Sequence, residues 1–157
     1  MATRSTIAYR TPEGRIVAVY CHWDGYPSNN GRILQENYQQ ALKIAQLISL
    51  GDISSLGREI GVKHAFNYFD TDMTSEEFEA KYGEMTTFYG RDRGEAGIEP
   101  RVFNDIPEWV REMAHSGCEY SYLWNGNEWL VNSYQRTSTN GFPEFDRVED
   151  VLEMDDA

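Results

Sequence analysis

The chain has 157 residues and a formal net charge of −12. This length suits one domain that buries a core without the help of disulfides or metals. The acidic excess argues against nonspecific binding to nucleic acid or to an anionic membrane, because both require a basic surface. The apolar runs are also too short to cross a bilayer.

Two strands are predicted at the start of the chain, over residues 5–11 and 15–23. Pro12 and Gly14 favour a tight turn between them, since proline presets φ and glycine accepts positive φ. Alternation divides the second strand into two faces. We expect the core face to carry Val17, Val19, Cys21 and Trp23. The opposite face would carry Ile16, Ala18, Tyr20, His22 and Asp24.

The next segments mix helical and strand-like patterns. A helical stripe runs from Leu34 to Ile48 and ends before Gly51, and residues 52–61 are predicted as a short helical turn. Residues 62–73 are rich in aromatic side chains, which favours a strand. Thr74 and Glu77 form a capping box that begins a short helix.

The second half of the chain carries clearer signals. Residues 85–100 are expected to form a strand that runs into a glycine-flanked loop, and Asp105 begins a helix over residues 106–116. Residues 118–134 are typical of a hairpin, with Asn125 and Gly126 at its turn. Residues 143–152 are expected to form a short acidic helix.

These elements do not alternate regularly, so a doubly wound parallel sheet is not expected. We predict an α+β fold: an antiparallel or mixed sheet of four to six strands built from two hairpins, with two main helices on one face. Residues 1–143 would form the single domain. Residues 144–157 would form an acidic helix or tail, because seven acids and one arginine give this segment a net charge of −6.

The first candidate site is the stretch YCHWDGYPSNNG, residues 20–31. His22 and Asp24 are the candidate catalytic pair, because a carboxylate can orient an imidazole for acid–base chemistry. The alternative is a structural loop in which His22 bonds a loop carbonyl while Gly25 and Pro27 shape the turn. No metal site is predicted, since Cys21 and His22 point to opposite faces of a strand.

The second candidate site is FYGRDRGE, residues 88–95. If this segment is extended, Arg91 and Arg93 point the same way and could bind a phosphate or carboxylate. Tyr89, together with Trp23 or Tyr26, could provide a stacking face for such a ligand. The alternative is that both arginines pair with neighbouring acids such as Asp92 and Glu95.

Four motifs, ATRSTIA, YCHWDGYPSNNG, LGDISSLG and YGRDRGE, resemble a group of small uncharacterised proteins encoded by bacteriophages. The resemblance covers roughly residues 2–95. It implies a viral protein in the cytoplasm of the host cell, which agrees with the lack of a hydrophobic export signal in MATRSTIAYR. It carries no catalytic residues over to this chain.

We therefore expect a non-catalytic, acidic binding protein that modulates or inhibits a host factor or defence system. The host partner would be a basic or nucleic-acid-binding protein, and the acidic surface could act as a DNA mimic. One alternative is a protein that binds or hydrolyses a nucleotide or other small phosphorylated ligand with the Arg pair and the His/Asp pair. Another is a structural or assembly accessory protein of the virus. No cofactor is expected.

Overall fold

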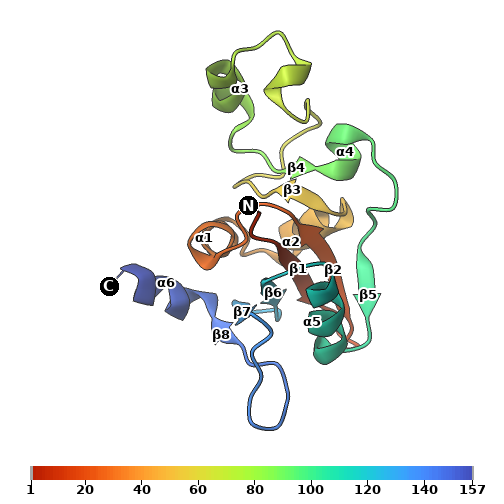
Figure 1. Cartoon of the computed structure of the whole chain (residues 1–157), viewed down its shortest axis with the longest axis vertical. Helices are drawn as coiled ribbons and strands as arrows, with labels where there is room; N and C mark the ends of the chain where they lie inside the picture. Colours follow the sequence, from red (N-terminus) through yellow and green to blue (C-terminus); the bar gives the residue numbers. More distant parts are fainter. Residues whose placement is uncertain (1, 157) are drawn as a thin grey trace.

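The computed structural model describes residues 2–156. Its centre is an eight-stranded mixed sheet (Figure 1). In chain order the strands are β1 (Ser5–Arg10), β2 (Ile16–Cys21), β3 (Ile53–Ser55), β4 (Thr87–Phe88), β5 (Arg101–Phe103), β6 (Tyr120–Trp124), β7 (Trp129–Ser133) and β8 (Asp146–Arg147). The α-helices are α1 (Arg32–Asn37), α2 (Ala41–Ser49), α3 (Ser75–Tyr82), α4 (Tyr89–Arg93), α5 (Ile106–His115) and α6 (Val148–Asp156). Two short helical segments of other types are η1 (Pro27–Gly31) and η2 (Tyr68–Asp70).

The two predicted hairpins form the centre of the sheet. The strand order is β4-β3-β2-β1-β6-β7-β8, and β5 also pairs with β2. β1 lies antiparallel to β2 and parallel to β6, so the two hairpins are joined through β1. β2 and β3 form the other parallel pair. The mixed sheet, the two hairpins and their turns confirm the coarse prediction.

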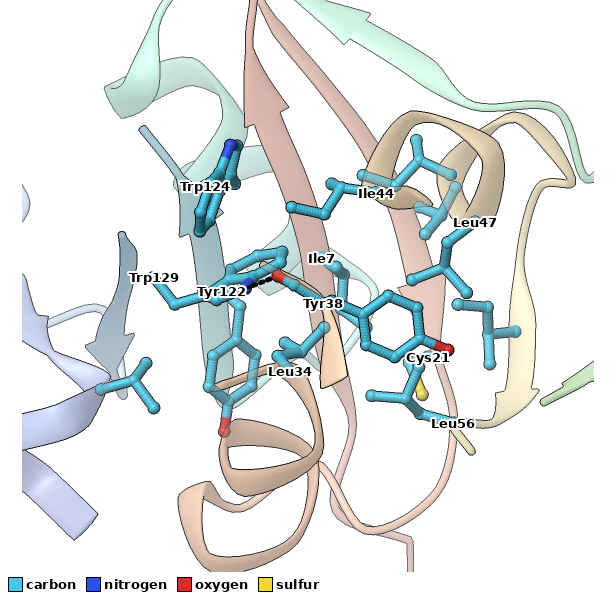
Figure 2. Packing of buried hydrophobic residues seen from close by; sticks show 14 of the residues in the cluster. Ile7, Cys21, Leu34, Tyr38, Ile44, Leu47, Leu56, Tyr122, Trp124 and Trp129 are labelled. Atoms are coloured by element: carbon cyan, nitrogen blue, oxygen red, sulfur yellow. Dashed lines mark hydrogen bonds between the residues drawn. The ribbon is translucent and has the colours of Figure 1, made fainter. Parts of the chain in front are cut away.

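Apolar side chains fill both faces of this sheet. The larger cluster joins β1, β2 and the second hairpin to α1, α2 and α6 through residues such as Leu34, Ile44 and Val148. Figure 2 shows part of this cluster, with Tyr38 and Trp129 linked by a hydrogen bond from the Trp129 indole to the Tyr38 carbonyl. Tyr122 and Trp124 of β6 lie in the same cluster.

The smaller cluster lies on the opposite face, beneath α5. Trp109 and Met113 of this helix pack against Ile16 and Ala18 of β2. The predicted arrangement with helices on one face is therefore wrong, and so is the count of four to six strands. The physical reason is that β2 is apolar on both sides, as is usual for a central strand covered twice.

Three local predictions are also wrong. Residues 52–61 contain the strand β3 rather than a helical turn, and residues 62–73 contain η2 but no strand. The expected helix around residues 34–48 is two helices, α1 and α2, separated at Tyr38–Gln40. At this break between the helices, the Tyr38 hydroxyl donates a hydrogen bond to the distant Gly57 carbonyl at 2.8 Å, which holds Tyr38 in place.

The acidic C-terminal segment belongs to the core rather than to a free tail. β8 pairs with β7, and Val148 and Leu152 of α6 are buried in the larger cluster. The acids of α6 at positions 149, 150, 153 and 155 are exposed. Among residues 2–156, no helix combines the length and apolarity needed to cross a bilayer.

Candidate functional site

The loop that contains the first candidate site begins where β2 ends. His22 and Trp23 each donate a backbone hydrogen bond to the neighbouring strand, at the Ile53 and Ser54 carbonyls. Asp24 then adopts a left-handed conformation with φ of 54° and turns the chain away from the sheet. His22 and Asp24 therefore do not sit on one extended face as predicted.

A buried glycine holds the loop against the sheet. The Gly25 N–H donates to the Thr3 carbonyl at 2.8 Å, and the Gly25 carbonyl accepts from the Tyr122 hydroxyl at 2.6 Å. A Cβ atom at this position would lie 2.7 Å from the Cβ of Ser5, so only glycine fits without displacement. Gly25 thus brings the loop backbone into contact with the first strand.

A buried asparagine provides the second anchor. The side chain of Asn30 is fully buried, and its amide donates to Ser5 Oγ at 3.2 Å and to the Trp23 carbonyl at 3.5 Å. These bonds close the loop upon itself. Two aromatic side chains of the loop face outward, with Trp23 44% exposed and Tyr26 39% exposed. The loop is therefore a preformed support for two accessible aromatic rings.

His22 has a different partner from the one predicted. Its Nδ1 lies 2.6 Å from the Tyr20 hydroxyl, whereas no interaction joins it to Asp24 within the described residues. Burial, and then the charge of Arg4, lower the pKa of His22 below its ordinary value of 6.5. Burial raises the pKa of Tyr20 to about 12. At neutral pH the phenol is therefore protonated and the imidazole is neutral, one hydrogen bond joins the two side chains, and the His22–Asp24 acid–base pair is not assembled.

Arg91 is a structural residue in this arrangement. It lies in α4 rather than in an extended segment, and all five of its N–H donors are bonded within the protein. Nη1 donates to the Ile60 and Gly61 carbonyls at 3.0 and 3.1 Å, and Nη2 donates to the Thr86 carbonyl at 2.9 Å. Nε and Nη2 also donate to the two carboxylate oxygens of Asp92. A phosphate could bind Arg91 only by breaking these bonds.

Asp92, which sequence analysis treated only as a possible partner, is the centre of this cluster. Its buried carboxylate also accepts from the backbone N–H groups of Phe88 and His64, at 2.8 and 3.1 Å. His64 is buried as well, with Nδ1 2.8 Å from the Val62 carbonyl and its ring stacked on Tyr82. The only signal in the sequence was an aspartate between two arginines, which does not reveal that the aspartate points inward.

Arg93 lies on the surface nearby. Its guanidinium covers the rings of Phe66 and Tyr89, at 4.5 and 5.2 Å from their centroids, and it pairs with Glu95 at 2.6 Å. Tyr89 also hydrogen-bonds with the Ser54 side chain. Arg91 is therefore internal and Arg93 is exposed. Each arginine pairs with a neighbouring acid, as in the alternative interpretation of the sequence.

A polar cleft of about 520 Å³ opens beside the loop. Asp24 and Asn29 form part of one wall, and Gly83 and Met85 form part of the facing wall. Its charged lining residues comprise four acids and two arginines: Asp24, Glu36, Glu79, Glu84, Arg32 and Arg58. Two ion pairs among the described residues of the cleft, Arg32–Glu36 and Arg58–Glu84, are long at 3.7 and 3.9 Å. The cleft is therefore net acidic and suited to cationic groups.

The facing wall belongs to a projecting segment, residues 62–86, which we call the arm. Figure 1 shows the arm, with α3, extending away from the sheet. Six acids and two lysines give it a net charge of −4. None of the residues of α3 is buried, and Phe69 near η2 is 76% exposed. Sequence analysis missed the arm because its aromatic residues resembled those of a strand.

Comparisons of the chain with family models, with curated proteins and with solved structures find no match in any of the three. Within the described residues, no group of three or more His, Cys, Asp or Glu side chains is arranged to hold a metal ion.

Proposed function

We propose that this protein is a phage-encoded acidic binding protein that modulates or inhibits a host factor without catalysing a reaction. The observation that supports this best is the acidic cleft bordered by a loop that is anchored at Gly25 and Asn30. Trp23 and Tyr26 flank Asp24 in the sequence, and Asp24 lines the cleft. A basic protein surface complements this combination of aromatic rings and carboxylates.

The anchoring of the loop favours tight binding. Interfaces gain most of their affinity from a few aromatic or arginine side chains, and ordering a flexible loop on binding reduces that gain. Trp23 and Tyr26 are displayed by a backbone that is already held by buried hydrogen bonds, so little ordering remains. The rings would provide the contacts that are resistant to salt.

The carboxylates would act mainly on the rate of association. The chain carries a net charge of −12, and the arm contributes −4 of it at the edge of the cleft. A field of this sign attracts a basic partner and increases the association rate, and salt weakens its effect. The same charges would repel nucleic acid, which supports a protein partner.

The nucleotide-directed alternative has less support. It required Arg91 and Arg93 to bind phosphate, yet Arg91 uses all five donors internally. Arg93 lies over Phe66 and Tyr89 and would have to leave Glu95 to bind an anion. The acidic cleft itself disfavours a phosphorylated ligand.

Site-specific crosslinking tests the proposal. A photo-crosslinking phenylalanine analogue is placed at Tyr26 or, as a control, at Asn127 in the exposed β6–β7 turn, and each protein is irradiated in an extract of the host bacterium. We expect a single basic partner to be captured from position 26 and not from position 127. Trp23→Ala should abolish the capture, and raising the salt from about 0.05 M to about 0.5 M should weaken it. Equal capture from both positions would refute the proposal.

Two double variants distinguish the effect of the acids in the cleft from the effect of the net charge of the protein. Glu36→Gln with Glu84→Gln neutralises two acids of the cleft, and Glu13→Gln with Glu153→Gln removes the same charge elsewhere. The cleft pair should weaken binding of the captured partner and reduce its salt dependence more than the control pair. Equal effects would show that only the net charge matters.

A further inference from the structure

A second pocket, of about 420 Å³, lies on the side of the sheet covered by α2. It is bounded by the end of β1, the β1–β2 turn and the first turns of α2. Most of its lining is apolar and comes from Tyr9, Pro12, Ala41, Ile44, Ala45 and Trp124. None of these residues belongs to the acidic cleft, so the pocket is separate from the proposed binding face.

One residue that lines this pocket, Trp124, carries an unpaired hydrogen-bond donor. Trp124 is only 6% exposed, and its indole N–H is buried without a partner among the described residues. The other two buried tryptophans are paired, because Trp109 donates to Thr6 Oγ1 at 3.1 Å and Trp129 donates to the Tyr38 carbonyl at 2.8 Å. In Figure 2 the nitrogen of Trp124 points away from Trp129 and Tyr122. A buried donor of this kind is rare and is satisfied when an acceptor reaches it.

Two further features around the pocket favour an anionic acceptor. Arg10 lines the pocket, and its guanidinium makes no hydrogen bond or ion pair within residues 2–156. The first turn of α2 also borders the pocket, and its N-cap residue Gln40 provides no side-chain cap. Uncapped N–H groups at a helix start attract negative charge. Glu13 is the one lining group that opposes an anion.

We propose that this pocket binds a small apolar molecule that ends in a carboxylate. The apolar body would lie between Ile44 and Trp124, and the carboxylate would accept from the Trp124 indole and from Arg10. The indole nitrogen is covered in the structure, so the acceptor reaches it after a lining side chain moves aside. Arg10 is exposed and unpaired, which allows it to move and then to close over the carboxylate. This site is independent of the partner proposed above.

Nuclear magnetic resonance of the protein labelled with ¹⁵N-tryptophan tests this inference, because each of the four indole N–H groups gives its own signal. The probe is 3-phenylpropionate, and the matched control is its amide, 3-phenylpropionamide. We expect 3-phenylpropionate to shift the Trp124 signal downfield and saturably, while the Trp109 and Trp129 signals stay in place. The amide should bind roughly tenfold more weakly because it carries no charge for Arg10.

Two variants test the role of the charges around the pocket and are expected to keep the fold. Arg10→Gln should weaken 3-phenylpropionate roughly tenfold, and Glu13→Gln should strengthen it. The proposal is overturned if the Trp124 signal does not move at up to about 10 mM probe. It is also overturned if the exposed Trp23 responds instead, or if the amide binds as tightly as the acid.

Discussion

The loop of residues 22–31 and the arm of residues 62–86 both carry aromatic and acidic side chains, but they differ in acid content and in how they are held. Both leave the sheet with aromatic and acidic side chains. The loop is fixed between its ends by the buried Gly25 and Asn30, whereas the arm is held at its base by the His64–Asp92–Arg91 cluster and buries none of α3. The loop is therefore held by buried contacts along its length, whereas the outer part of the arm is not.

The comparison also shows how each segment would contribute to binding. A preformed loop supplies contacts whose geometry is set before the partner arrives. A projecting acidic segment supplies attraction at longer range. The cleft lies between the two, lined by Asp24 and Asn29 from the loop and by Glu79 and Gly83 from the arm.

The largest effect is expected at the base of the arm. Arg91→Ala removes five hydrogen bonds and leaves the buried Asp92 carboxylate without its positively charged partner, which should cost about 3–5 kcal/mol of the free energy of unfolding. Arg93→Ala, two residues away, should cost less than about 1 kcal/mol because its pair with Glu95 is exposed. Urea denaturation of both variants measures the difference, and equal costs would contradict the assigned roles.

An intermediate effect is expected where the loop is anchored. Gly25→Ala places a methyl group 2.7 Å from the Cβ of Ser5 and 2.8 Å from the Thr3 carbonyl oxygen, so the loop must shift. We expect a loss of about 1–3 kcal/mol in the free energy of unfolding, as for other overpacked sites. The exposure of Trp23 should change with it, and tryptophan fluorescence quenching by iodide reports that change. A variant as stable as the wild type would show that the loop is not tightly held.

A small effect is expected at the tip of the arm. Phe69→Ser removes a side chain that is 76% exposed, so the free energy of unfolding should change by less than about 0.5 kcal/mol. The same denaturation experiment that measures Gly25→Ala provides the comparison. A loss as large as that of Gly25→Ala would mean that the tip is packed against the body after all.

The hairpins and α5 could be predicted because their signals are local. The turn at Pro12 and Gly14, the Asn125–Gly126 pair and the cap at Asp105 each specify a structure within a few residues. The predicted cap at Asp105, where α5 begins, is confirmed, since the Asp105 side chain accepts a hydrogen bond from the Glu108 N–H at 2.9 Å.

The elements that were missed depend on distant parts of the chain. β3, β5 and β8 have two or three residues each, and their conformation is set by the strands that they join. β4 falls within the segment where a strand was predicted, but it is only two residues long. Helix packing on both faces was recoverable in principle from the apolar run IVAVYC of β2, which does not alternate. The inward direction of Asp92 has no local signal, so the role of Arg91 could not be separated from that of Arg93 in advance.

The smallest expected effect concerns pH. Burial, followed by the charge of Arg4, lowers the pKa of His22 in the folded protein below 6.5. The unfolded chain therefore binds a proton at a higher pH than the folded chain, and stability is lost as the pH falls below 6.5 through the folded pKa. His22→Gln should flatten this part of the stability profile slightly, as measured by thermal unfolding between neutral and mildly acidic pH. An unchanged profile would contradict the lowered pKa.

The most direct test of the binding surface is an amide NMR titration of the ¹⁵N-labelled protein with a lysine-rich peptide, which stands in for a basic partner. The account predicts that shifts concentrate at the Trp23 indole, Asp24 and the residues that line the cleft, and that Trp23→Ala reduces the affinity. Shifts spread evenly over every acidic segment, including α6, would contradict it, because they would show attraction to charge without a site.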